Sequence, residues 1–65
     1  MEGTVKWFSA EKGYGFVESA GKEYFLHYSE INGDGFKTVV AGETVAFSAA
    51  PSPKGPLAKN VMRLL

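Results

Sequence analysis

The chain has 65 residues, seven Lys and Arg against seven Asp and Glu, and no cysteine. This length predicts one domain over residues 1–65, and the missing cysteine excludes disulfides and thiolate metal sites. The balanced charge argues against a strongly electrostatic nucleic-acid binder. No apolar run approaches the roughly 18 residues of a membrane span, and the N-terminus does not read as a signal peptide. We therefore expect a cytoplasmic protein that needs no cofactor and no membrane.

Short strands are predicted along the whole chain, because eight Gly and three Pro interrupt it and no segment has a helical apolar stripe. The first predicted strand is Gly3–Ser9. Its neighbours Trp7 and Phe8 cannot both face a small core, since successive side chains point to opposite faces. Either one of the two is exposed, or a twist or bulge in the strand re-aims it.

The next two predicted strands, Tyr14–Glu18 and Glu23–His27, form a hairpin around the loop at 19–22. Five of the nine aromatic residues and the only histidine lie between positions 12 and 28. Alternation within the hairpin brings four side chains to one surface: Tyr14, Phe16, Phe25 and His27. It sends three others to the opposite face: Tyr24, Leu26 and Tyr28.

The second half of the chain continues the pattern. A short helical turn is expected at Tyr28–Ile31, followed by a glycine-rich loop that ends on Phe36. A fourth strand follows Gly42, with Val45, Phe47 and Ala49 directed inward. Pro51–Pro56 cannot be a central strand, and the last strand is expected at about Leu57–Leu64. Five short strands predict a small antiparallel barrel, closed or nearly so, which removes exposed sheet edges.

A barrel this small has little interior room, because even eight strands enclose only their own side chains. Its expected core is Val5, Val17, Leu26, Ile31, Val45, Phe47 and Val61. The rings on the hairpin surface, with one of Trp7 or Phe8 and with Phe36, are then surplus to the interior. A contiguous apolar patch of several hundred Å² on the outside is typical of a binding site.

The motifs behind this surface resemble those of a known family. Residues 12–17 (KGYGFV) and 24–28 (YFLHY) look like the two RNA-binding motifs of the cold-shock domain. Three further matches stand in the same order: 5–8 (VKWF), 33–38 (GDGFKT), and 54–56 (KGP) with Asn60-Val61. Five motifs in register over essentially the whole chain make this a specific resemblance to the bacterial cold-shock proteins.

The resemblance implies a five-stranded oligonucleotide/oligosaccharide-binding (OB) barrel that binds single-stranded RNA and DNA, with pyrimidine-rich strands expected. It also implies an ATP-independent RNA chaperone that responds to stress and melts RNA secondary structure. We expect a monomer, with strand exchange into a dimer as the alternative, and no obligate protein partner. The residues carried over as contacts are Lys6, Trp7, Tyr14, Phe16, Phe25, His27, Tyr28 and Phe36, with Phe8, Lys12 and Lys54 in secondary positions. Lys37, like Lys6, Lys12 and Lys54, is expected to contact the phosphate backbone.

The sequence departs from the family pattern in places. Tyr14 and Tyr28 stand where phenylalanine is usual, and a phenol still stacks. Tyr24 replaces an inward valine, so its hydroxyl needs a partner or an exit to water. Ser9 replaces a common asparagine, and the prolines at 51 and 53 stiffen a loop that is usually more polar.

Two other function classes compete with this interpretation. An enzyme would need an acid–base pair, an activated nucleophile or a metal set, and one histidine among scattered carboxylates offers none of these. A small barrel with an aromatic groove also suits proline-rich peptides. Lysines and a histidine interleaved with the rings favour nucleic acid over that peptide-binding module.

Overall fold

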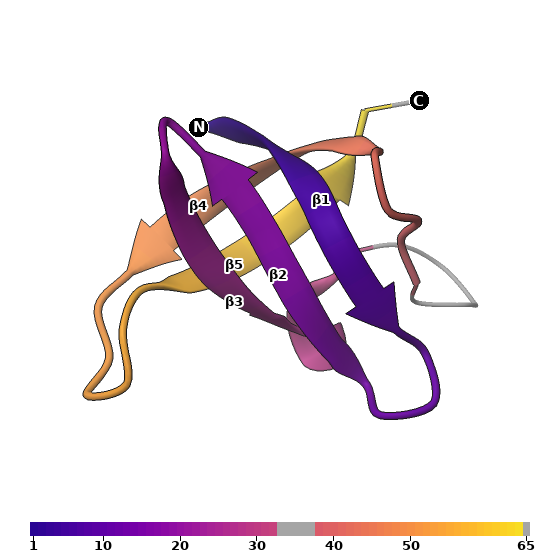
Figure 1. Cartoon of the computed structure of the whole chain (residues 1–65), viewed down its shortest axis with the longest axis horizontal. Helices are drawn as coiled ribbons and strands as arrows, with labels where there is room; N and C mark the ends of the chain where they lie inside the picture. The colour runs from indigo at the N-terminus through magenta and orange to yellow at the C-terminus, as the bar shows by residue number, and fades with distance from the viewer. Residues whose placement is uncertain (33–37, 65) are drawn as a thin grey trace.

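A closed barrel is the architecture of the chain in the computed structural model, which describes residues 1–32 and 38–64 (Figure 1). The strand order around the barrel is β1-β2-β3-β5-β4. No helical segment in these ranges is long and apolar enough to cross a membrane. The elements of the described residues are β1 (Glu2–Ser9), β2 (Tyr14–Ser19), β3 (Lys22–His27), the 3-10 turn η1 (Tyr28–Glu30), β4 (Thr44–Ala50) and β5 (Leu57–Arg63).

The predicted all-β barrel is confirmed, with one difference in strand direction. β3 and β5 run parallel, joined through Phe25 opposite Leu57 and Leu26 opposite Ala58, whereas the other four seams are antiparallel. Strand directions cannot alternate all the way around a ring with an odd number of members. A closed five-stranded barrel therefore needs one parallel seam, and the expectation of a purely antiparallel sheet was wrong at this point.

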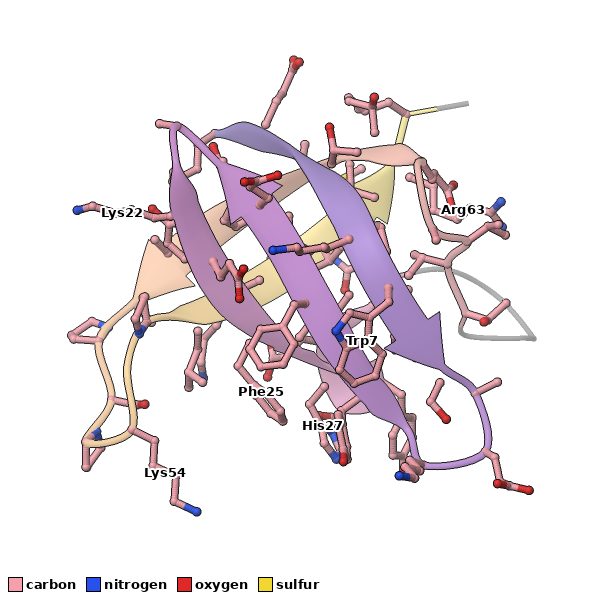
Figure 2. All side chains as sticks on the ribbon, in the orientation of Figure 1. Trp7, Lys22, Phe25, His27, Lys54 and Arg63 are labelled. Carbon is pink, nitrogen blue, oxygen red and sulfur yellow. The ribbon has the colours of Figure 1, made fainter. Side chains whose placement is uncertain are left out.

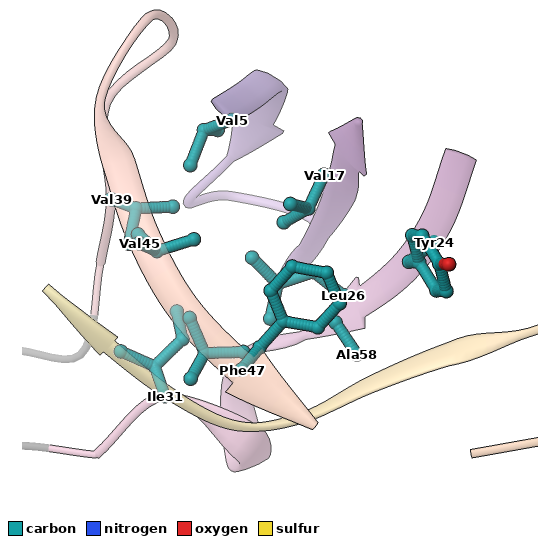
Figure 3. Packing of buried hydrophobic residues seen from close by; sticks show 10 residues of the cluster. Val5, Val17, Tyr24, Leu26, Ile31, Val39, Val45, Phe47 and Ala58 are labelled. Atoms are coloured by element: carbon teal, nitrogen blue, oxygen red, sulfur yellow. The ribbon is translucent and has the colours of Figure 1, made fainter. Parts of the chain in front are cut away.

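Within the described ranges, the barrel interior holds the seven expected core residues and three more (Figure 3). Val17, Leu26, Val45 and Val61 are fully buried, as is the additional Ala58. Tyr24 and Val39 complete the cluster. Ala49, expected to point inward, is exposed. The register between β4 and β5 shifts between Ala46 and Ser48, so simple alternation along β4 does not continue to its end.

A bulge in β1 decides the orientation of its two neighbouring aromatic residues. Val5 lies opposite Val17, but Trp7 lies opposite the adjacent Phe16, so β1 carries one extra residue at Lys6. Val5 is buried, Trp7 is 40% exposed, and Phe8 is half-buried against the core. The bulge thus keeps both Lys6 and Trp7 on the outside, which strict alternation forbids.

Gly15 allows β1 and β2 to approach closely. A Cβ atom at this position would lie 2.1 Å from the Trp7 carbonyl oxygen and 2.6 Å from the Phe8 Cα. Both neighbours are backbone atoms and cannot rotate away. Only glycine therefore fits at the middle of β2.

The segment before β4 is tied to β5 by an ion pair. The Glu43 carboxylate accepts from the Arg63 guanidinium and, at 2.8 Å, from the Val40 backbone N–H. Burial alone would raise the pKa of Glu43. The hydrogen bonds from Arg63 and Val40, with the charge of Arg63, outweigh it and hold that pKa below the ordinary value of 4.5.

Gly15→Ala is expected to lower the free energy of unfolding by about 1–3 kcal/mol or more, because the added Cβ overpacks against rigid backbone, and this is a large share of the about 3–5 kcal/mol that a core this size supplies. Thermal denaturation followed by circular dichroism measures this. Gly21→Ala is the control: its Cβ meets nothing within 4 Å, so it carries only the strain of a left-handed backbone at φ 78°. If the two variants lost the same amount of thermal stability, the close approach of the strands at Gly15 would be contradicted.

Glu43→Gln is expected to lower the free energy of unfolding at pH 7 by about 1–3 kcal/mol. A carboxyl with a depressed folded-state pKa stabilises fully above its unfolded pKa, and this contribution disappears as the pH falls through the folded value. The difference in free energy of unfolding between wild type and variant should therefore disappear in acid. Denaturation at pH 7 and in steps below pH 4.5 measures it. If this difference in stability stayed constant as the pH falls, the ion pair with Arg63 could not be its cause.

Candidate functional site

A tight hairpin sets which side chains share the outer face of β2 and β3. Ala20 and Gly21, with φ 52° and 78°, form the two-residue turn between these strands. Positive φ at both central residues gives a hairpin turn whose twist matches its strands. The resulting register sets Phe16 opposite Phe25, and Tyr14 opposite His27. The prediction that these four side chains reach one surface is confirmed.

Four rings on this face form a closed array, which we call the aromatic platform: Trp7, Tyr14, Phe16 and Phe25. Trp7 of β1 lies 5.8 Å from Tyr14 and 5.6 Å from Phe16, measured between ring centroids. Phe25 of β3 lies 5.5 Å from Tyr14 and 5.8 Å from Phe16. Figure 2 shows Trp7, Phe25 and His27 together on the same side of the sheet. Tyr14, Phe16 and Phe25 are half-buried, so solvent still reaches their rings.

His27 and Tyr28 extend the platform at the end of β3. Their ring centroids are 4.7 Å apart, with the planes inclined at 38°. The strand ends at His27 and η1 begins at Tyr28, so the tyrosine ring lies beside the histidine and is 49% exposed. Its backbone N–H donates to the Gly13 carbonyl, 2.9 Å away. The expectation that alternation sends Tyr28 to the face opposite His27 was wrong, because alternation stops where the strand does.

Ser29 fixes the orientation of the His27 ring. The Ser29 backbone N–H donates to His27 Nδ1 at 3.2 Å, and its hydroxyl lies 2.9 Å from the same nitrogen. A backbone N–H can only donate, so Nδ1 accepts and the neutral ring carries its proton on Nε2. His27 therefore presents a hydrogen-bond donor outward. Ser29 was not among the predicted site residues, because its contact with His27 depends on the turn that begins at Tyr28.

The lysines expected at this face occupy different settings. Lys6 reaches across β2 to form an ion pair with Glu23 of β3, and both side chains are 48% exposed. The hydrogen bond to Glu23, together with its charge, raises the pKa of Lys6 above 10.5. Lys12 and Lys54 are exposed in turns. Lys37 and Phe36, also expected at the site, lie outside the described residues.

Two hollows adjoin Phe25 where the barrel turns from β3 to β5. The larger, about 370 Å³, is lined by Phe16, Phe25, Ser52, Lys54, Gly55 and Leu57. The smaller, about 100 Å³, is lined by Phe25, His27, Glu30, Leu57, Ala58 and Lys59. The first brings Lys54 next to two platform rings. The lining residues from β5 were not predicted from the sequence, because Leu57 lies more than 30 positions from Phe25 along the chain and meets it only in the closed barrel.

Tyr24 and Phe8 lie apart from the platform. Tyr24 is buried with its ring 5.1 Å from Phe47, and Figure 3 shows its hydroxyl directed away from the other core side chains. The expectation that Tyr24 points inward is confirmed. Phe8, expected as a secondary contact, packs against the core from its half-buried position.

Comparison with known proteins gives one consistent result. The family model described as the "'Cold-shock' DNA-binding domain" matches residues 1–64. The chain is 48% identical over 65 residues to "Cold shock-like protein CspE" of Bacillus anthracis, which covers 98% of the chain and 97% of that protein. It is 48% identical over 64 residues to "Cold shock protein CspA" of Staphylococcus haemolyticus and of Staphylococcus aureus, with 97% of both chains covered. These matches confirm the resemblance drawn from the five sequence motifs.

Proposed function

The chain belongs to the cold-shock DNA-binding domain family, and from this membership and the aromatic platform we propose that it binds single-stranded RNA and DNA by base stacking. The observation that carries the proposal is the closed array of four rings, whose centroids lie 5.5–5.8 Å apart on one face of β1, β2 and β3. Every nucleobase has a π-face, so such an array accepts unpaired bases with little regard to sequence. His27 and Tyr28 lengthen the stacking surface.

The energetics support binding led by stacking. Each base stacked on an aromatic ring is worth about 1–3 kcal/mol by alanine substitution, so four rings supply on the order of 4–12 kcal/mol before ordering costs. This range corresponds to roughly millimolar to nanomolar dissociation constants. The net charge of zero gives no strong electrostatic term to add.

Phosphate contacts are assigned a smaller part in this proposal. Lys54 is exposed beside Phe16 and Phe25, Lys12 is exposed in the turn before β2, and Phe36 and Lys37 complete the proposed contact set from the sequence pattern. Lys6 is held by Glu23, so a phosphate must compete with a carboxylate for its ammonium group. Few counterions are then released on binding, and salt should weaken the complex only gently.

The same chemistry accounts for chaperone activity without ATP. Stacking needs unpaired bases, and a duplex hides them, so the protein binds only the open form of an RNA hairpin. A ligand that binds one state shifts the equilibrium towards it by RT ln(1 + [L]/Kd) for one site. We propose that the protein, as a monomeric single domain in the cytoplasm, keeps RNA unpaired in this way, with no catalytic step and no cofactor.

Phe25→Ala is expected to weaken binding of an oligothymidine about five- to a hundredfold, which corresponds to roughly 1–3 kcal/mol for one lost stacking ring. Titration followed by Trp7 fluorescence measures the dissociation constant. Met62→Ala, a change at an exposed apolar residue of β5, should leave binding unaltered. A proline-rich peptide should not quench Trp7. Unchanged binding in Phe25→Ala, or quenching by the peptide alone, would refute the proposed function.

The dissociation constant should depend weakly on salt, with a log–log slope of magnitude about 1–3 at roughly 0.7 per neutralised phosphate. Glu23→Gln releases Lys6 from its ion pair, so this variant should bind more tightly at low salt and show a steeper slope. Titrations of both proteins at several salt concentrations measure the slopes. A wild-type slope above about 5 would show that charge, and not stacking, leads the binding.

A further inference from the structure

The smaller hollow beside the platform lies on the parallel seam of the barrel. β3 and β5 pair here through only two residue pairs, Phe25 with Leu57 and Leu26 with Ala58. The hollow has a volume of about 100 Å³ and shares Phe25 with the platform, so it directly adjoins the surface proposed to stack bases. Its polar lining comes from His27, Glu30 and Lys59.

Glu30 is the hydrogen-bond acceptor of this lining, and it is held in place from β5. Its Oε1 accepts from the Asn60 backbone N–H at 3.3 Å, and its Oε2 lies 3.9 Å from Lys59 Nζ. The Glu30 side chain is 30% exposed, and an ionised carboxylate has about four acceptor sites. At least two of these therefore remain for a ligand that donates hydrogen bonds.

A structural role explains Glu30 only in part. An ion pair at 3.9 Å with a lysine that is 46% exposed contributes little to stability, and the hydrogen bond to Asn60 is long. A carboxylate beside a surface for polyanions also repels phosphate. A base-reading contact would offset that repulsion.

Two hydrogen-bond donors line the hollow together with this carboxylate. Lys59 contributes an ammonium group from β5. His27 contributes an N–H, because Ser29 occupies its Nδ1 and leaves the proton on Nε2. The lining thus combines one anionic acceptor with two donors, beside the apolar surfaces of Phe25 and Leu57.

We propose that this hollow is a base-recognition subsite that selects cytosine, whose exocyclic N4 amino group donates to the Glu30 carboxylate. Carboxylates read cytosine in this way in nucleic-acid complexes. The N3 and O2 acceptors of the same base face Lys59 or His27. Thymine and uracil carry a carbonyl oxygen at position 4, and their single ring N–H lies between two carbonyl oxygens, which a carboxylate repels. The small volume suits a single-ring base better than a purine. The inference rests on the proposed single-strand binding and adds a base preference to it.

The test is a series of heptathymidines in which one cytosine is stepped through each position, titrated by Trp7 fluorescence. In the wild type, cytosine at one position should strengthen binding about five- to tenfold over thymine. Glu30→Gln keeps the side-chain length but loses the charge, so the preference should shrink, and Glu30→Ala should abolish it. Thermal denaturation confirms that both variants are folded.

Glu2→Gln is the matched control, because it removes the same charge from an exposed residue at the far end of β1. It should raise affinity for all heptamers alike and keep the cytosine preference. Equal binding of every heptamer by the wild type, a preference that survives in Glu30→Ala, or adenine preferred to cytosine at that position would overturn the subsite. Failure of the all-thymine strand to bind would instead refute the proposed function.

Discussion

The close approach of β1 and β2 at Gly15 is the constraint on which the binding face depends. The backbone of Trp7 and Phe8 occupies the space that any side chain at position 15 would need. This contact follows directly after the bulge at Lys6, where β1 stops alternating. Beyond the bulge, Trp7 turns outward to meet Tyr14 and Phe16, while Phe8 lies against the core. A side chain at position 15 would separate the two strands and with them the rings of the platform.

The division between core and platform follows from the size of the barrel. Among the residues that the structure describes, ten fill its interior, mostly aliphatic, and of these only Tyr24 and Phe47 carry aromatic rings. Tyr24 and Phe25 are neighbours in the chain, yet one is packed inside and the other belongs to the outer array. The two-residue turn at Ala20 and Gly21 sets this parity, because a hairpin one residue longer would exchange the faces of β3.

Electrostatics on this face restrain binding more than they drive it. Glu23 holds Lys6, and Glu30 lies near Lys59, so these two lysines beside the platform already have acidic neighbours. In the proposed complex, stacking carries the affinity and charged groups are available for discrimination between bases. The proposed RNA complex would then dissociate readily, since release from stacked rings does not require recapture of many counterions.

The sequence by itself determined the strands, the seven central core residues, the pairing of the hairpin and the family, because these depend on local alternation, turn residues and contiguous motifs. Only the tertiary structure decided the features that depend on closure of the barrel. The parallel seam follows from an odd number of strands, and the bulge at Lys6 settles which of Trp7 and Phe8 faces out. Exposure of Ala49 depends on a register shift against β5, and the place of Tyr28 depends on where β3 ends. The meeting of His27 and Glu30 with Lys59 also required the fold, since residues about 30 positions apart become neighbours only when β5 closes against β3.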